Sequence, residues 1–338
     1  MGRQLKAADE LENSFVSDRV KILIPKFEAL APYSRKKRET GVKGEDIEGW
    51  KSLATKEALI LRGSYSTPES RLRQVTALKK ALKQAAKNVK DSANYHPTLT
   101  IITHFGEALS FLFSEDTFIK NEKTQERVAF QSSPENRVEL DLTPFLKEAY
   151  TTLKQVSEGA TKDEVEWRDV SCALALVTGR RMGEIHLSGV FTKSGDYQVT
   201  FKGQLKGKNR KVKIGSEKLA LRDYEFTIPT LVSADLVENG IEWLAENGKR
   251  FEPTEDPERV NRRWSKVLSQ RVGDSWNLFD GMTYHKFRGA YFRACVENAS
   301  IDPYDWEDYA KSVLGDDDSA TIKAYKRFII TKGSITRI

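Results

Sequence analysis

Two adjacent arginines stand in the segment Thr178-Gly179-Arg180-Arg181-Met182-Gly183-Glu184, which follows a helix predicted over residues 163–176. We expect Arg181 to begin a new helix, where free backbone N–H groups favour anions and a guanidinium binds phosphate through two hydrogen bonds. Glu184, three residues on, has the spacing to hold Arg181 or its helix. The segment therefore predicts an anion site with Arg181 as its first member.

The residues that could use such a site follow in order along the chain: Lys206, His285, Arg288 and Tyr325. His285 and Arg288 are three apart, so a helix places them on one face. Lys206 lies in a predicted turn, placed to protonate a leaving oxygen. A phenol with a pKa of about 10 is a poor nucleophile unless cations surround it. Together these side chains describe attack of Tyr325 on a phosphodiester whose charge Arg and His stabilise.

The order Thr-Gly-x-Arg-x-x-Glu, a lysine in a turn, His-x-x-Arg, Leu-Gly and a late Tyr resembles the tyrosine recombinases and type IB topoisomerases. Residues 177–182, 191–204 and 314–328 resemble more narrowly the protelomerases, the hairpin telomere resolvases. This resemblance extends over roughly residues 145–330.

The resemblance implies that Arg181 and Arg288 clamp the scissile phosphate, Lys206 is the general acid and His285 donates to a phosphate oxygen. Tyr325 would form a 3′-phosphotyrosine on a palindromic double-stranded DNA site, cut by a homodimer. The strands would then rejoin as covalently closed hairpin ends. Because the phosphotyrosine conserves the bond energy, no ATP, metal or other cofactor is expected.

One position departs from the family pattern. The family has His directly after Leu-Gly, nine residues before the tyrosine, where this chain has Asp316. An ionised carboxylate cannot donate a hydrogen bond, and it repels phosphate. We expect Asp316 to lower the rate of cleavage.

The charge is compatible with DNA binding without requiring it. The 338 residues carry a formal charge of +6 and a pI of about 9.0. A basic helix is predicted over residues 67–89; its lysines are candidate phosphate contacts or a solvated face. Arg180 is a rival for the first arginine role, with a DNA-backbone or structural role expected, and Lys286 could face DNA or solvent. The candidate DNA-binding residues are Arg180, Lys79, Lys80, Lys83, Lys87 and Lys286.

We predict a mostly α fold with a small antiparallel sheet, in two domains. Residues 1–138 would form a helical, DNA-embracing N-terminal domain and residues 139–338 a tyrosine-recombinase-like catalytic domain, with an irregular linker at 131–136. Period-two alternation predicts strands at 197–201 and 211–214, joined by a hairpin turn at 206–209. Further helices are predicted at residues 143–155, 233–247, 256–270, 284–298 and 319–329.

The chain shows no signal peptide or membrane-spanning apolar run, and its two cysteines suit a reducing compartment. We expect a soluble cytoplasmic protein, encoded by a bacterium or phage and associated with the nucleoid. Three alternatives stay open: a conventional tyrosine recombinase or integrase, a non-catalytic DNA-binding protein with a degenerate recombinase fold, favoured by Asp316, and a helical scaffold.

Overall fold

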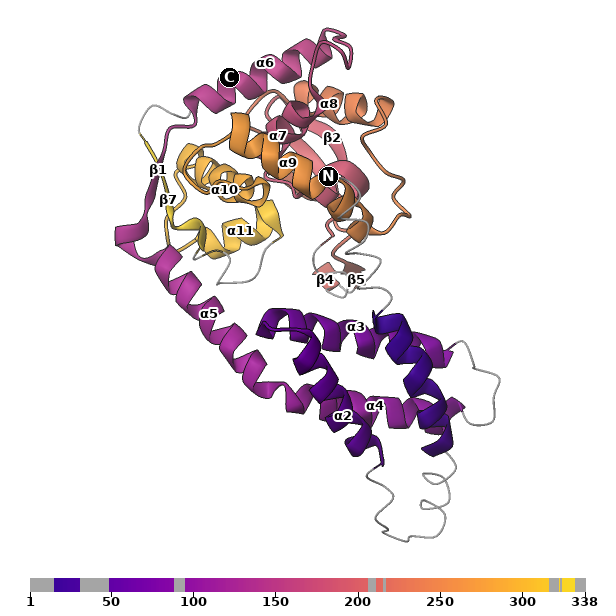
Figure 1. The fold of residues 1–338 in the computed structure, drawn as a ribbon. Coiled ribbons are helices and arrows are strands. Elements are labelled where there is room, and N and C mark those ends of the chain that lie inside the picture. The colour runs from indigo at the N-terminus through magenta and orange to yellow at the C-terminus, as the bar shows by residue number, and fades with distance from the viewer. Residues whose placement is uncertain are drawn as a thin grey trace. The chain divides into compact units, whose positions relative to one another are not determined.

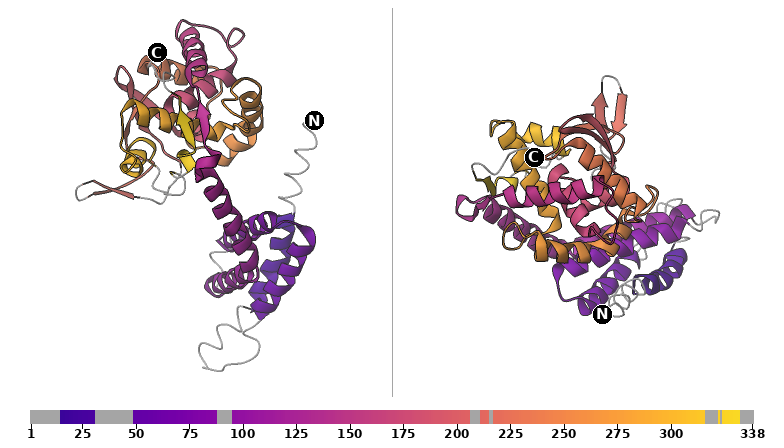
Figure 2. Two further views of the ribbon diagram at one scale, coloured as in Figure 1. Left: turned by 90° about the vertical axis from the view of Figure 1, so that its left-hand side faces the viewer. Right: turned by 90° about the horizontal axis from the view of Figure 1, so that it is seen from above.

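The computed structural model describes residues 15–30, 49–87, 95–205, 211–214, 217–315, 322 and 324–331. The chain divides into two compact units, Met1–Glu126 and Arg127–Ile338 (Figures 1 and 2), where the sequence predicted domains of 1–138 and 139–338. The described residues are mainly helical, with a small antiparallel sheet in the second unit, which confirms the predicted fold class.

The first unit is built from helices that enclose one apolar core. A helix over residues 15–30 is followed by α2 (Gly49–Ser64), α3 (Pro68–Lys87), α4 (Tyr95–Leu112) and α5 (Ser114–Ser132). Helix α3 begins as predicted: the N–H of Ser70 donates to Oγ1 of Thr67 at 3.2 Å, and Pro68 occupies the first turn. The core includes Leu61, Leu78, Leu82, Phe105 and Leu109, all with 0% exposure.

Where the sequence predicted an irregular linker at 131–136, the structure has the end of a helix and a 3-10 turn. Helix α5 continues to Ser132, and a 3-10 turn, η2 (Pro134–Asn136), leads directly to strand β1 (Val138–Leu140). Of the residues that suggested a loop, Gln131 and Ser132 belong to the end of α5 and residues 134–136 to η2.

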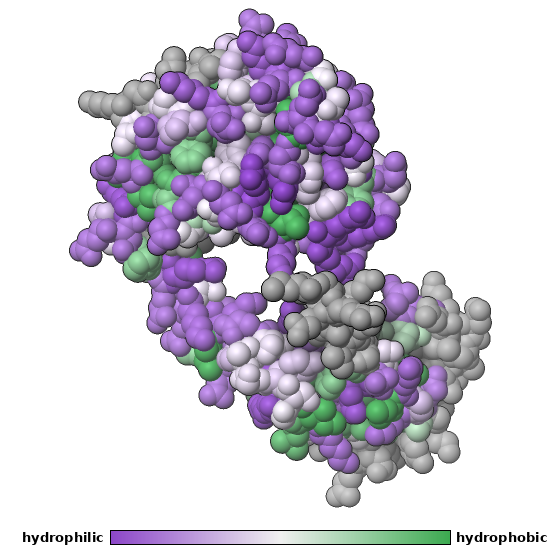
Figure 3. Space-filling view, turned by 45° about the horizontal axis from the view of Figure 1, so that its top comes forward, coloured by the Kyte–Doolittle hydropathy of each residue, from purple (hydrophilic) through white to green (hydrophobic). Residues whose placement is uncertain are grey.

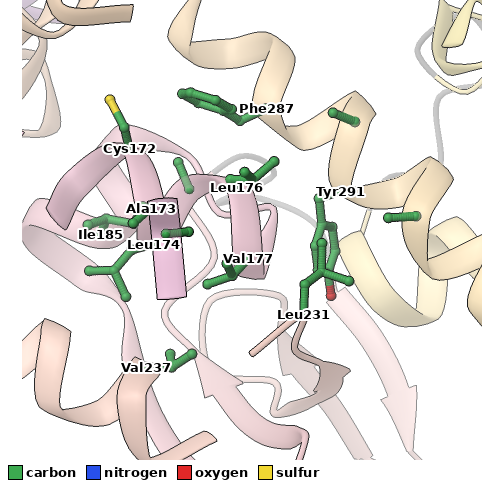
Figure 4. Packing of buried hydrophobic residues seen from close by; sticks show 14 of the residues in the cluster. Cys172, Ala173, Leu174, Leu176, Val177, Ile185, Leu231, Val237, Phe287 and Tyr291 are labelled. Carbon is green, nitrogen blue, oxygen red and sulfur yellow. The ribbon is translucent and has the colours of Figure 1, made fainter. Parts of the chain in front are cut away.

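Helix α7 (Trp167–Thr178) lies at the centre of the second unit, and every residue from Val170 to Thr178 is buried. It packs against α6 (Thr143–Ser157), α8 (Ala234–Glu246) and α10 (Phe287–Asn298). Figure 4 shows its apolar side chains among Phe287 and Tyr291 of α10, with Leu231 and Val237 nearby. This packing holds both ends of α7, and therefore the segment that follows it, in one place.

The predicted period-two strand forms the middle of the sheet. The order is β2 (Val190–Gly195), β3 (Gln198–Lys202) and β6 (Phe226–Pro229), all antiparallel. Val199 and Phe201 are fully buried, as the alternation predicted.

The predicted pairing of the strand at 211–214 is wrong. Strand β4 (Lys211–Ile214) pairs with β5 (Glu217–Ala220), because β2 and β6 already occupy the two edges of β3. The predicted turn at 206–209 lies outside the described residues.

The last described element is a strand. Residues 322, 324 and 325 are helical, but β7 (Phe328–Ile330) then pairs in parallel with β1, Val138 opposite Phe328. The helix predicted to reach residue 329 therefore ends earlier, because β1 offers its backbone groups to the chain. The other elements of the second unit are the π-helix η3 (Glu184–Ser188), α9 (Pro257–Ser275), the 3-10 turn η4 (Tyr284–Lys286) and α11 (Trp306–Leu314).

Within the part of the chain that the structure describes, no helix is both long and apolar enough to cross a membrane. On the face drawn in Figure 3, hydrophilic side chains cover most of the surface and apolar ones form small patches.

Candidate active site

A left-handed glycine ends α7 and leads into the arginine pair. Gly179 has φ 66°, which glycine adopts without steric cost, and its N–H donates to the carbonyl of Ala175 at 3.0 Å. Beyond the turn, the backbone N–H of Arg181 donates to Oε2 of Glu184 at 3.0 Å, and its Nη1 donates to Oε1 at 3.0 Å. Glu184 therefore holds both the backbone and the side chain of Arg181, as their spacing predicted.

Glu184 is a buried carboxylate among arginines. Its exposure is 0%, and burial acts to raise its pKa, but the charges of Arg181, Arg288 and Arg180 outweigh burial and lower the pKa overall. Glu184 therefore stays ionised and offsets part of the cationic charge. The Arg181 side chain remains 16% exposed.

Arg180 was predicted to contact DNA or to serve a structural role, and it is buried with 1% exposure. Its Nη2 donates to the carbonyl of Val313 at 2.7 Å, its Nε donates to that of Thr178 at 3.2 Å, and the guanidinium stacks 4.6 Å from the Phe201 ring. Burial, with the charge of Arg288, lowers its pKa to about 10, so it is still charged at neutral pH. A DNA-backbone contact does not fit this interior position.

The end of α11 accepts hydrogen bonds from other parts of the site. Nη2 of Arg288 donates to the carbonyl of Leu314 at 2.6 Å, and its Nη1 donates to that of Gly179 at 2.8 Å. Nε2 of Gln204 donates to Leu314 at 3.0 Å and to Gly315 at 3.2 Å. Gly315 has φ 66°, and a Cβ there would lie 2.6 Å from Nε2 of Gln204. These contacts join the arginine turn, the end of the sheet and the segment after α11.

His285 and Arg288 lie on successive elements with different exposure. His285 is exposed on η4, whereas Arg288 has 1% exposure in the first turn of α10. Between them, Lys286 is half-buried: its Nζ donates to the carbonyl of Gly281 and lies 5.1 Å from the Phe279 ring. Burial and the nearby Arg327 lower the pKa of Lys286. Its ammonium is thus partly engaged within the unit.

Tyr325 packs against α10, close to Arg288 along that helix. Its ring lies 5.4 Å from that of Phe292, and a Cβ placed on Gly289 would come within 3.1 Å of Cδ1 of Tyr325. Gly289 directly follows Arg288, so the predicted nucleophile packs against the chain neighbour of a predicted phosphate ligand. The Tyr325 residue is 6% exposed.

Two predicted residues, Lys206 and Asp316, lie outside the described residues. Gln204 stands two positions before Lys206, and Gly315 stands directly before Asp316. The 3.2 Å hydrogen bond between Gln204 and Gly315 therefore ties together the chain neighbours of both residues.

The predicted DNA-binding lysines of α3 differ in their surroundings. Lys80, Lys83 and Lys87 are exposed, but Lys79 is half-buried and its Nζ donates to Oγ of Ser110 at 2.7 Å. The first three are accessible to a phosphate backbone, whereas Lys79 already has a partner.

Sequence reasoning missed a basic surface on α9, although it predicted the helix. Arg259, Arg262, Arg263 and Lys266 are exposed and recur at the i, i+3, i+4, i+7 spacing of one helical face. Arg263 lies 4.9 Å from the Trp264 ring, and Arg259 pairs with Glu255. The spacing of these cations was the signal that could have shown this surface.

The comparisons with known proteins point to one family. The family model for the telomere resolvase ResT/TelK catalytic domain matches residues 136–328. The protelomerase of Klebsiella oxytoca phage phiKO2 is 30% identical over 179 residues, which are 48% of this chain and 27% of that protein. The protelomerase of Escherichia phage N15 is 27% identical over 216 residues, 60% of this chain and 33% of that protein. The matched regions thus span no more than about a third of these relatives.

Solved structures show the same fold at low identity. Selenomethionine protelomerase TelA covalently complexed with substrate DNA aligns with a TM-score of 0.60 and 18% identity, over 92% of this chain and 88% of that one. Protelomerase TelK complexed with substrate DNA aligns with a TM-score of 0.50 and 19% identity, over 95% and 61%. With the family match covering more than half of the residues, the chain belongs to the family of telomere resolvases that share the ResT/TelK catalytic domain.

Proposed function

We propose that this protein is a telomere resolvase, which cuts palindromic double-stranded DNA through a 3′-phosphotyrosine at Tyr325 and rejoins the strands as hairpin ends. The observation that carries the proposal is the position of the Tyr325 ring against Gly289, next to Arg288, whose guanidinium reaches the turn before Arg181. The proximity of the predicted nucleophile to the two predicted phosphate ligands supports this proposal.

Each predicted residue has a step in this reaction. Arg181 and Arg288 bind the non-bridging oxygens, and His285 donates a further hydrogen bond to them. The Tyr325 oxygen attacks phosphorus and loses its proton, the bond from phosphorus to the 5′ oxygen breaks, and Lys206 protonates that oxygen. The 5′ hydroxyl of the folded-back strand then attacks the phosphotyrosine and restores the phenol, so no external energy source is needed.

The low exposure of Tyr325 bears on the first step. Because the residue is only 6% exposed, we propose that the Tyr325 side chain moves toward the DNA before its oxygen attacks. We assign this change to DNA binding, and it makes cutting conditional on the bound substrate.

The DNA contacts that we propose lie on two helices. Lys80, Lys83 and Lys87 of α3 offer exposed ammonium groups, and α9 offers the basic surface of Arg259, Arg262, Arg263 and Lys266. Each phosphate contact releases counterions, so affinity should fall steeply with salt.

Two further features belong to the proposal. A palindromic site presents two equivalent scissile phosphates, which a homodimer can engage symmetrically. The phage origin of the matched relatives and two buried free cysteines support a bacterial cytoplasm as the place of action.

The experiment that tests the function uses a short duplex with a candidate telomere palindrome, incubated in EDTA without ATP and run on a denaturing gel. We expect rapidly renaturing hairpin products with the wild type and none with Tyr325→Phe. Covalent adducts that resolve to recombinants would indicate a conventional recombinase instead. Binding without cleavage would indicate a non-catalytic DNA-binding protein.

A further inference from the structure

A continuous chain of buried hydrogen bonds runs beneath the turn that carries His285. His186 and Ser171 have 0% exposure and Tyr284 has 7%. Nδ1 of His186 lies 2.7 Å from the carbonyl oxygen of Lys249, and its Nε2 lies 2.7 Å from Oγ of Ser171. Oγ of Ser171 lies 2.8 Å from the hydroxyl of Tyr284.

The chemistry of these groups gives the chain one direction. The Lys249 carbonyl can only accept, so Nδ1 of His186 carries a proton. Burial lowers the pKa of His186 to about 4, which keeps the imidazole neutral at pH 7 and leaves Nε2 to accept from the hydroxyl of Ser171. The Tyr284 hydroxyl then donates into Ser171, to Oγ or to its carbonyl oxygen at 3.0 Å. Each donor is used once, so the chain is fully satisfied.

This chain of hydrogen bonds joins the segment that follows Arg181 to the segment that carries His285. His186 lies on η3, two residues after the Glu184 that holds Arg181, and Ser171 lies within the buried length of α7. Tyr284 begins the 3-10 turn and directly precedes His285. A displacement at either end would therefore change the position of His285 relative to Arg181.

The surroundings of Tyr284 strengthen this link. Its ring packs edge-on against Phe287 at 5.8 Å, so buried aromatic residues flank the exposed His285 and the half-buried Lys286. With both flanks in the core, the turn has little freedom, and the Tyr284 hydroxyl is its polar attachment to α7.

We infer that Tyr284, Ser171 and His186 are positioning residues that act through His285 and hold its imidazole against the scissile phosphate. The inference rests on the proposed function. An imidazole displaced by about 1 Å loses a large part of its effect, because transition-state hydrogen bonds depend on distance and angle. A purely structural role would instead lower stability and weaken every step that needs a folded site.

The test compares the same substitution in two backgrounds. Tyr284→Phe removes only the hydroxyl, and single-turnover formation of the covalent adduct is measured on a nicked duplex that traps it. We expect adduct formation to slow by about tenfold or more in the wild-type background. In a His285→Ala background the same substitution should change the rate by less than about twofold, since the group it positions is gone. An equal loss in both backgrounds overturns the inference.

Tyr291→Phe is the matched control. The Tyr291 hydroxyl donates to the carbonyl of Pro229 at 2.6 Å, so the variant also loses a hydrogen bond. Tyr291 lies on α10 and is not part of the His186–Ser171–Tyr284 hydrogen-bond chain. We expect adduct formation within about twofold of wild type. A loss as large as that of Tyr284→Phe would show that any buried hydroxyl matters equally, and would overturn the inference.

A second variant keeps the test decisive if Tyr284→Phe does not fold. Ser171→Ala breaks the chain at its middle with little change in volume, and the same dependence on His285 is expected. If the wild type forms no adduct at all, the proposed function fails and the inference falls with it. If the wild type forms an adduct that Tyr325→Phe abolishes, but the rate losses of Tyr284→Phe and His285→Ala simply multiply in the double variant, only the inference is wrong.

Discussion

Glu184 accepts two hydrogen bonds from Arg181, one from its backbone N–H and one from its guanidinium, each 3.0 Å long. Because Glu184 is fully buried, Glu184→Gln should leave the arginine cluster without its counter-charge. We expect the free energy of unfolding to fall by about 3 kcal/mol and the cleavage rate to fall with it. Urea denaturation and single-turnover assays measure the two effects.

Glu158→Gln is the control for this change. Glu158 forms an exposed ion pair with Lys154 at 3.9 Å, a kind of contact that contributes little to stability. A loss for Glu184→Gln no larger than that for Glu158→Gln would contradict the role given to the buried carboxylate.

Lys206→Ala should lower the rate of cleavage of ordinary DNA by roughly 100-fold or more, because the leaving 5′ oxygen then departs unprotonated. In a substrate with sulfur in place of the bridging 5′ oxygen, the leaving group departs as a thiolate and needs no general acid. On this substrate we expect Lys206→Ala to cleave at a rate close to that of the wild type, whereas Tyr325→Phe should remain inactive. Equal inactivity of Lys206→Ala on both substrates would assign the general acid to another residue.

Neutralising the α9 surface should weaken DNA binding in a salt-dependent way. The double variant Arg262→Ala/Lys266→Ala removes two proposed phosphate contacts, so the slope of log affinity against log salt should fall by about 1 to 2. A titration by fluorescence anisotropy at several salt concentrations measures it. The double variant Lys147→Ala/Lys154→Ala on α6 removes the same charge from exposed positions. If both double variants behave alike, net charge and not the α9 surface determines binding.

His186 should make the fold sensitive to acid. Its pKa falls from 6.5 to about 4 on burial, so the unfolded chain binds the proton at a higher pH than the folded one. Stability from the neutral imidazole is complete above pH 6.5 and is lost as pH falls toward 4, by about 1.4 kcal/mol per unit. We expect His186→Gln to flatten the dependence of unfolding free energy on pH between 6.5 and 4.5. Parallel curves for wild type and His186→Gln would rule out this contribution.

The sequence predicted those features that depend on local pattern. The alternation at Val199 and Phe201 identified the middle strand, and the Arg181–Glu184 spacing identified a contact within one turn. The family resemblance predicted the fold class because its motifs lie in the segment that forms the core of the second unit.

The features that the sequence could not predict depend on partners far away in the chain. Arg180 and Arg181 are the same residue type side by side, and the interior position of the first depends on contacts such as that with the carbonyl of Val313, 133 positions away. The strand at Phe328–Ile330 is short enough to read as the end of a helix until Val138–Leu140 is placed beside it. No local sequence pattern indicates the hydrogen bonds of His186, because the fold brings its partners from distant parts of the sequence.

The parallel pairing of β1 with β7 joins the two ends of the second unit, because the strand after Tyr325 pairs with the first strand of the unit. Tyr325 stands three residues before Phe328, so the predicted nucleophile lies directly before this strand pair. Any movement of the Tyr325 side chain is therefore coupled, through three residues, to the pairing that holds the last described strand of the unit against its first.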